Sequence, residues 1–293
     1  MPRRPVDLLH FRVLLALLLL AAGLGLAGRL VDWLPSVLLY AGLLAAVFVI
    51  AWLDRRFPRS RIVEILTNFY PLLVVPPVFN SLQPLITAVG LPNQDPALIA
   101  IDQMLLGGRH ATVWLQRFVT PWLNDLMHIA YCTYYVFPLV VGVAMWRASR
   151  PLARRFIFTV ALAFYVSYVG YFLVPARGPR FAQDHLYTVS TRTTTISRSI
   201  YDTLNEAEKT KDDVFPSGHN MITAVCLIAA YRFRRRIFWS LLPVAILLAI
   251  STVYCRFHYV IDVVAGVALA FATFPVGYAI YDRAARRGAT DAA

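Results

Sequence analysis

The sequence predicts an all-α fold, a polytopic bundle of transmembrane helices. Hydrophobic residues make up 59% of the 293 residues and charged residues 15%, and the mean hydropathy is +0.60. Apolar runs of membrane-spanning length recur along the chain, and short arginine clusters separate many of them. A chain with these three features has lipid as its main solvent.

We expect about eight spans, each an apolar run close to the length that crosses a hydrocarbon core. The first follows a basic stretch at residues 1–12. We interpret it as a retained helix, because no cleavage site leads into a soluble domain and further spans follow at once. The expected spans are residues 13–27, 36–53, 62–79, 126–146, 156–174, 216–231, 237–254 and 258–281.

Nothing in the sequence divides the chain into separate domains, since it has neither an internal repeat nor a low-complexity tract. We expect one integrated membrane domain with two parts. Residues 1–125 would form N-terminal transmembrane helices and an outer interfacial segment. Residues 126–293 would form a helical core that carries the motifs described below. The three cysteines form no close pair, so neither a disulfide framework nor a thiolate metal site is indicated.

The positive charges predict how the bundle is oriented. Of the 28 Lys and Arg residues, 18 fall on one side of the eight alternating spans, in short clusters. Because short basic loops stay in the cytoplasm, we expect both termini to be cytoplasmic and residues 175–215 and 251–258 to lie outside. We expect an integral membrane protein of the plasma membrane. The net charge of +12 does not indicate a nucleic-acid partner, because no basic stretch with interleaved aromatic residues occurs outside the membrane flanks.

One informative stretch lies where a polar segment meets an apolar run, at Pro216-Ser-Gly-His219. Proline suits the first helical position, so the helix is expected to begin at Pro216. The free N–H groups of its first turn, beside Ser217 and Gly218, would attract a phosphate oxygen. His219 would stand in that turn and exchange a proton near neutral pH. The alternative is a tight turn with a histidine that caps or packs.

A second informative stretch, Ser251 to Asp262, holds a histidine and an aspartate four residues apart. On a helix, His258 and Asp262 share one face. A carboxylate that accepts one ring N–H leaves the other ring nitrogen free to attack phosphorus or take a proton. A structural His–Asp pair is the alternative. With His219 at the outer end of another helix, the three residues indicate a phosphoryl-transfer site, in which one histidine carries the phosphoryl group and the other protonates the departing oxygen.

Further polar candidates lie on the predicted outer face. Arg177, Arg180 and Arg256 are cations near apolar spans, where a charge usually has a partner or a function. We expect such a partner or function for each of them, and the alternative is that they snorkel toward lipid phosphates. Asp102 and Gln103 lie in an amphipathic interfacial segment and would bind a polyol acceptor, or else belong to a solvated helix. The sequence offers no ligand cluster for a metal, and we expect no metal and no cofactor.

These motifs resemble those of the membrane-bound type 2 phosphatidic acid phosphatase superfamily, over about the C-terminal half of the chain. The family's Pro-Ser-Gly-His block is complete at residues 216–219. Its Ser-Arg…His…Asp block has Thr252 where the family has arginine. Its basic block is partial, because Val174-Pro-Ala-Arg-Gly-Pro-Arg180 lacks the upstream lysine and is followed by Phe181. These departures resemble the inositol phosphorylceramide synthase branch.

The resemblance implies a role for each matched residue. The implied catalytic residues are His258 as nucleophile, Asp262 as its orienting carboxylate and His219 as general acid. The implied phosphate ligands are Ser217, Gly218 and Arg180, with further positive charge from Arg177 or Arg256. The implied enzyme is a phosphatidic acid phosphatase-type phosphoesterase or a phosphotransferase, whose acceptor is water or an alcohol such as inositol.

The depth of His219 indicates a lipid substrate. Thirteen residues separate it from the basic cluster at Arg232, roughly 20 Å of helix, which is less than a hydrocarbon core of about 30 Å. A lipid phosphate or phospholipid would reach a histidine just below the outer surface. The competing hypotheses are a transporter or scramblase that uses the buried His and Asp, an intramembrane serine protease that uses Ser217 with His258, and a bis-histidine haem protein. The oligomeric state stays open.

Overall fold

The computed structural model describes residues 4–290, with side chains described to residue 286. Within these residues the secondary structure is helical and includes no strand, which confirms the all-α prediction. The elements are α1 (Pro5–Leu26), α2 (Trp33–Arg56), α3 (Arg61–Asn80), α4 (Leu82–Val89), α5 (Asp95–Leu105), α6 (Ala111–Trp114), η1 (Leu115–Phe118), α7 (Pro121–Cys132), η2 (Thr133–Tyr135), α8 (Phe137–Ala148), α9 (Arg150–Leu173), α10 (Pro179–Ala182), η3 (Asp184–Leu186), α11 (Thr195–Ala207), α12 (Gly218–Phe233), α13 (Arg235–Tyr254) and α14 (Val260–Thr290).

Six of the described helices are long and apolar enough to cross a membrane: α1, α2, α3, α9, α13 and α14. The pair α7–η2 and α8 forms a seventh candidate, bent by 44°. The span expected at residues 216–231 corresponds to α12, which has only 16 residues. The count of eight spans therefore stays a prediction. So does the cytoplasmic placement of the termini, whose last residues, 1–3 and 291–293, lie outside the described part of the chain.

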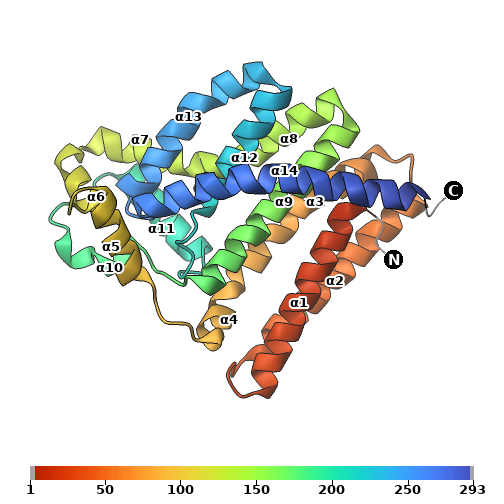
Figure 1. Ribbon diagram of the computed structural model, residues 1–293, viewed down its shortest axis with the longest axis horizontal. Coiled ribbons are helices and arrows are strands. Elements are labelled where there is room, and N and C mark those ends of the chain that lie inside the picture. The colour runs from red at the N-terminus through yellow and green to blue at the C-terminus, as the bar shows by residue number, and fades with distance from the viewer. Residues whose placement is uncertain (1–3, 291–293) are drawn as a thin grey trace.

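The helices form one bundle with α12 at its centre, where it contacts α8, α9, α13 and α14 (Figure 1). The pair α1 and α2 packs along one side, against α3 and α9. The shorter segments α5, α6 and α10 gather at the end of the bundle that lies away from both chain ends. This end is the predicted outer face.

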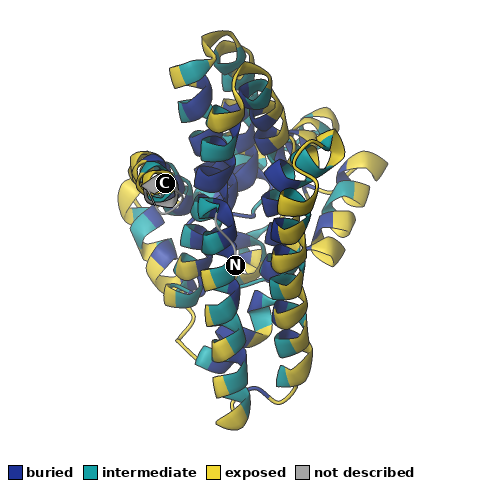
Figure 2. Ribbon diagram, turned by 90° about the vertical axis from the view of Figure 1, so that its right-hand side faces the viewer, coloured by how far each residue is buried: buried dark blue, intermediate teal, exposed yellow. Residues whose placement is uncertain are grey.

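The core lies along α12 and the helices around it. It includes Phe137, Phe156, Met221, Leu248 and Phe274, one from each of α8, α9, α12, α13 and α14. Figure 2 shows buried residues along the middle of the molecule and exposed ones on the outward faces of the helices. Apolar side chains on the outward faces suit a lipid solvent, and close packing then holds the helices together.

Two glycines allow α12 to begin close to its neighbours. A Cβ at Gly266 of α14 would lie 2.5 Å from the Ser217 carbonyl oxygen, and one at Gly170 of α9 would lie 2.2 Å from Pro216 Cδ. Neither position has room for a side chain. The start of α12 is therefore held between α9 and α14, which fixes the position of the Pro-Ser-Gly-His motif.

Candidate active site

The Pro-Ser-Gly-His motif forms a capped helix start. Ser217 is the N-cap, and its hydroxyl oxygen accepts from the Asn220 N–H at 3.4 Å and from Asn220 Nδ2 at 3.0 Å. The helix begins at Gly218, so the predicted start at Pro216 was two residues too early. The reason is that the Ser217 N–H donates to the Asp262 carbonyl oxygen at 3.1 Å, which fixes Ser217 outside the helix.

The structure brings the two predicted histidines together. The ring centres of His219 and His258 are 5.7 Å apart, although 39 residues separate them in the chain. Tyr131 and Tyr134 lie against the His219 ring, with centroid distances of 4.4 and 4.2 Å. Nε2 of His219 is buried and has no hydrogen-bond partner in the described structure. The hydrogen-bonding capacity of this nitrogen is therefore unused in the described structure.

His258 and Asp262 lie close together, as their spacing predicts, but a backbone carbonyl is the nearer partner of the histidine ring. Its Nδ1 lies 3.0 Å from the Val214 carbonyl oxygen and 3.6 Å from Asp262 Oδ2. A carbonyl oxygen can only accept, so Nδ1 carries the proton and donates it to Val214. Asp262 Oδ2 instead accepts from the Tyr259 N–H at 2.7 Å, because Asp262 lies in the first turn of α14 and satisfies a free N–H there. The backbone of Val214 thus fixes the tautomer, and the Asp262 carboxyl group lies close to the same ring nitrogen.

Arg180 is the predicted phosphate ligand whose charge acts on both His219 and His258. Its guanidinium carbon lies 4.8 Å from the centre of the Phe257 ring, and its backbone N–H donates to the Arg256 carbonyl oxygen at 2.9 Å. The side-chain atoms Nε and Nη1 are buried without an acceptor. Unused guanidinium donors beside two imidazoles suit a bound phosphate.

Arg177 does not join this group. Its side chain is 59% exposed and lies 3.4 Å from Asp212. Its backbone matters more, because the N–H groups of Arg177 and Gly178 both donate to the Asp95 carboxylate at 2.8 Å. Asp95 also accepts from the Tyr259 hydroxyl at 2.8 Å. Asp95, which our sequence analysis did not select, ties the loop that carries Arg180 to the turn that carries His258.

Arg256 lies next to the site but points elsewhere. Its backbone has a φ of 66°, an uncommon conformation for a residue other than glycine. Its side chain stacks on Tyr187, 3.7 Å from the ring centre, and Nη2 donates to the Val189 carbonyl oxygen. Together with Arg180 it lines a separate polar cavity.

The predicted acceptor ligands have structural partners. Asp102 accepts from the N–H groups of Val260 and Ile261 at 2.9 and 2.8 Å and so caps α14. Burial raises the pKa of Asp102, and these two hydrogen bonds lower it. Gln103 Nε2 lies 3.0 Å from His110 Nε2. No contact among the described residues joins Asp102 or Gln103 to the two histidines.

Two acidic residues that sequence reasoning missed lie beside Arg180. Burial, with a smaller contribution from Glu208, raises the pKa of Asp213 to about 6, and Arg180 and His258 oppose this shift. Burial also raises the pKa of Glu208, whose Oε1 accepts from the Tyr135 hydroxyl at 2.6 Å. The polar loop before Pro216 was the available signal, since Asp213 lies three residues ahead of it. In the described part of the chain, no three His, Cys, Asp or Glu side chains gather as metal ligands.

The helical fold and the paired histidines define an integral membrane protein with a polar site at one end of its bundle. A model of the PAP2 superfamily matches residues 96–276, which is more than half of the chain, and the chain belongs to this superfamily. No curated protein and no solved structure matches it. The family confirms the predicted superfamily, while the inositol phosphorylceramide synthase-like branch stays a prediction. Membership supports a phosphoesterase or phosphotransferase that acts on lipid phosphates in a membrane.

Proposed function

We propose that the protein transfers the phosphoryl group of a lipid phosphate or phospholipid to water or an alcohol, through a phosphohistidine on His258. The observation that carries the proposal is the pairing of His219 and His258, 5.7 Å apart, beside the unpaired donors of Arg180. The charge bias of the short loops supports a site on the outer face of the plasma membrane.

In the first step, Nε2 of His258 attacks phosphorus while Nδ1–H stays bonded to the Val214 carbonyl. Arg180 neutralises charge on the phosphoryl oxygens. His219 gives a proton to the departing lipid oxygen, and takes one back from the water or alcohol that attacks the phosphohistidine. We assign Ser217 to the cap that holds His219 in place, rather than to direct contact with phosphate, because its hydroxyl oxygen accepts from Asn220.

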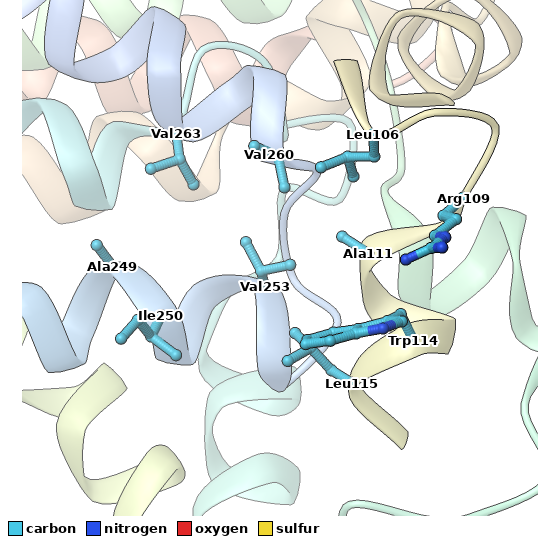
Figure 3. Close-up of a pocket in the computed structure, with 10 residues that line it drawn as sticks. All are labelled: Leu106, Arg109, Ala111, Trp114, Leu115, Ala249, Ile250, Val253, Val260 and Val263. Atoms are coloured by element: carbon cyan, nitrogen blue, oxygen red, sulfur yellow. The ribbon is translucent and has the colours of Figure 1, made fainter. Parts of the chain in front are cut away.

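An apolar groove beside the catalytic turn supports a lipid substrate. It has a volume of about 530 Å³ and lies between α13, α14 and the α5–α6 region (Figure 3). Val253 and Val260, which line it, flank the turn that holds His258. Arg109 stands in its lining, where a cation would meet a lipid phosphate or ester. An acyl chain in this groove would keep the headgroup close to the histidines.

The experiment uses purified protein in vesicles that contain phosphatidic acid with a labelled phosphate. We expect phosphate release that falls roughly 10²–10⁴-fold in His219→Ala, the usual size of a general acid–base contribution, and at least as much in His258→Ala. Acid-labile, base-stable label should accumulate on the wild-type chain and be absent from His258→Ala.

His185→Ala is the matched control, because His185 is an exposed histidine of η3 outside the site. It should keep the wild-type rate. Full activity in both His219→Ala and His258→Ala would disprove the proposal.

A further inference from the structure

A second polar cavity lies beside Arg180, and we call it the arginine pocket. It has a volume of about 200 Å³, and three arginines line it: Arg180, Arg192 and Arg256. Tyr201, which also lines it, stacks on Phe257 with ring centres 5.9 Å apart. Because His258 follows Phe257 directly, the arginine pocket and the paired histidines lie on either side of one short turn and share Arg180.

The guanidinium groups in the arginine pocket hold unused donors. Nε of Arg256 is buried and has no acceptor in the described structure. Arg180, whose free donors serve the transferred phosphoryl group, adds its positive charge to the lining. Burial lowers the pKa of Arg256, since removal from water disfavours the charged form. Buried polar atoms of this kind normally have partners, and a phosphate oxygen is the acceptor that suits a guanidinium best.

Aromatic rings hold these arginines in place without using their donors. Arg256 stacks on Tyr187 at 3.7 Å, and Arg192 on Tyr201 at 4.5 Å. Such stacking orients a guanidinium plane and leaves its edge N–H groups free. The arginine pocket is therefore preorganised for an anion and not simply a gap between surface side chains.

The lining also indicates what carries the anion. Apart from Arg180, Tyr201 and the Cys255–Arg256 pair, it comes from the polar segment 184–192, with the hydroxyl groups of Thr188 and Ser190 and one carboxylate, that of Asp184, against the three arginines. The apolar groove, by contrast, is lined by aliphatic side chains of the membrane helices α13 and α14 and by largely apolar residues of the α5–α6 region. A lipid tail suits the groove, whereas a water-soluble group with hydroxyls and a phosphate suits the arginine pocket.

We infer that the arginine pocket binds the phosphate of a phosphorylated polyol, which accepts the phosphoryl group from His258. This inference rests on the proposed function. A hydroxyl of the bound polyol attacks the phosphohistidine, so the bond between Nε2 and phosphorus breaks as a new oxygen–phosphorus bond forms. The hydroxyl proton moves to His219, which thereby regains the proton that it gave to the departing lipid alcohol.

The test compares glycerol 3-phosphate with glycerol as acceptors, with labelled phosphatidic acid as donor. For the wild-type protein we expect kcat/KM for label transfer to glycerol 3-phosphate to exceed that to glycerol at least tenfold, mainly through KM. In Arg256→Met and Arg192→Met this ratio should fall below three. A general loss of activity or folding lowers both rates and cancels in the ratio.

Arg198→Met is the matched control, since Arg198 is an exposed arginine of α11 outside the arginine pocket, and it should keep the wild-type ratio. Two results would overturn the inference and leave the proposed function intact. One is lipid hydrolysis by a wild-type protein whose kcat/KM is about equal for glycerol 3-phosphate and glycerol. The other is an unchanged ratio of these two values in Arg256→Met. Absence of any reaction with lipid phosphates would instead count against the proposed function.

Calorimetry with the wild-type protein separates the two sources of phosphate. We expect glycerol 3-phosphate to bind at least tenfold more tightly than inorganic phosphate, and Arg256→Met to lose this difference. Equal affinities, together with no label transfer, would make the arginine pocket a site for the released phosphate and would overturn the acceptor assignment.

Discussion

The ring N–H of His258 donates a hydrogen bond to the main-chain carbonyl oxygen of Val214. The residue before Val214 is Asp213. Asp213 holds a carboxyl group beside Arg180 and His258, with a pKa raised to about 6 mainly by burial. The pKa of this carboxyl group is higher in the folded protein than in the unfolded chain, where it is near 4, so its protonated form stabilises the fold below about pH 4. This stabilisation is lost as the pH rises through 6. At neutral pH the Asp213 carboxylate therefore costs stability.

We predict that Asp213→Asn raises the free energy of unfolding by about 1–2 kcal/mol at pH 7.5 and by much less at pH 4.5. The neutral amide also cannot compete with a phosphate for Arg180. KM for the lipid phosphate should then rise less between pH 5 and 7 in the variant than in the wild type. Thermal unfolding at both pH values and a pH series of initial rates measure these effects. Equal stabilisation at both pH values would show that the charge of Asp213 is not responsible.

At the scale of elements, we expect the close approach of α14 to the start of α12 to set the distance between the histidines. Gly266 faces the Ser217 carbonyl so closely that a Cβ would lie 2.5 Å from it. Backbone cannot yield as a flexible side chain can, so Gly266→Ala should move the two helices apart. Overpacking of this kind costs about 1–3 kcal/mol.

We predict that Gly266→Ala lowers kcat about 10²-fold, because a displacement near 1 Å at a reacting centre has an effect of that size. Gly42→Ala in α2 is the matched control, since a Cβ there meets nothing within 4 Å. Initial rates and thermal unfolding of both variants test this. Equal rates in the two variants would mean that the contact between α12 and α14 does not position the histidines.

The elements also show which parts of the site a sequence can predict. Hydropathy predicts the long helices, and the two motifs identify His219 and His258, because their chemistry is carried by side-chain type and local spacing. The Val214 carbonyl and the roles of Asp95 and Asp102 could not be predicted this way. A backbone acceptor has no side-chain signature. Asp95 and Asp102 accept hydrogen bonds from segments that lie about 80 and 160 residues further along the chain, and local spacing does not indicate such contacts.

For the whole molecule, the position of the basic loops predicts that the polar end of the bundle faces outward. In a variant whose three native cysteines are replaced, a cysteine at Ser190 should react with a membrane-impermeant maleimide in intact cells. A cysteine at Ser149, which is exposed between α8 and α9, should react only after permeabilisation. The reverse pattern would place the histidines toward the cytoplasm and would contradict the charge-based orientation.

The hydrogen bonds of Asp95 limit how a substrate could enter. The Asp95 carboxylate accepts from the N–H of Gly178, two residues before Arg180, and from the hydroxyl of Tyr259, which follows His258. The Arg180 N–H donates to the Arg256 carbonyl oxygen. The proposed phosphate ligand, Arg180, and the proposed nucleophile, His258, are therefore held by one hydrogen-bonded frame, so neither can move away without the other. Any gate for the lipid must be built from parts that this frame does not hold, such as the bent α7–α8 pair or the segment at residues 184–192.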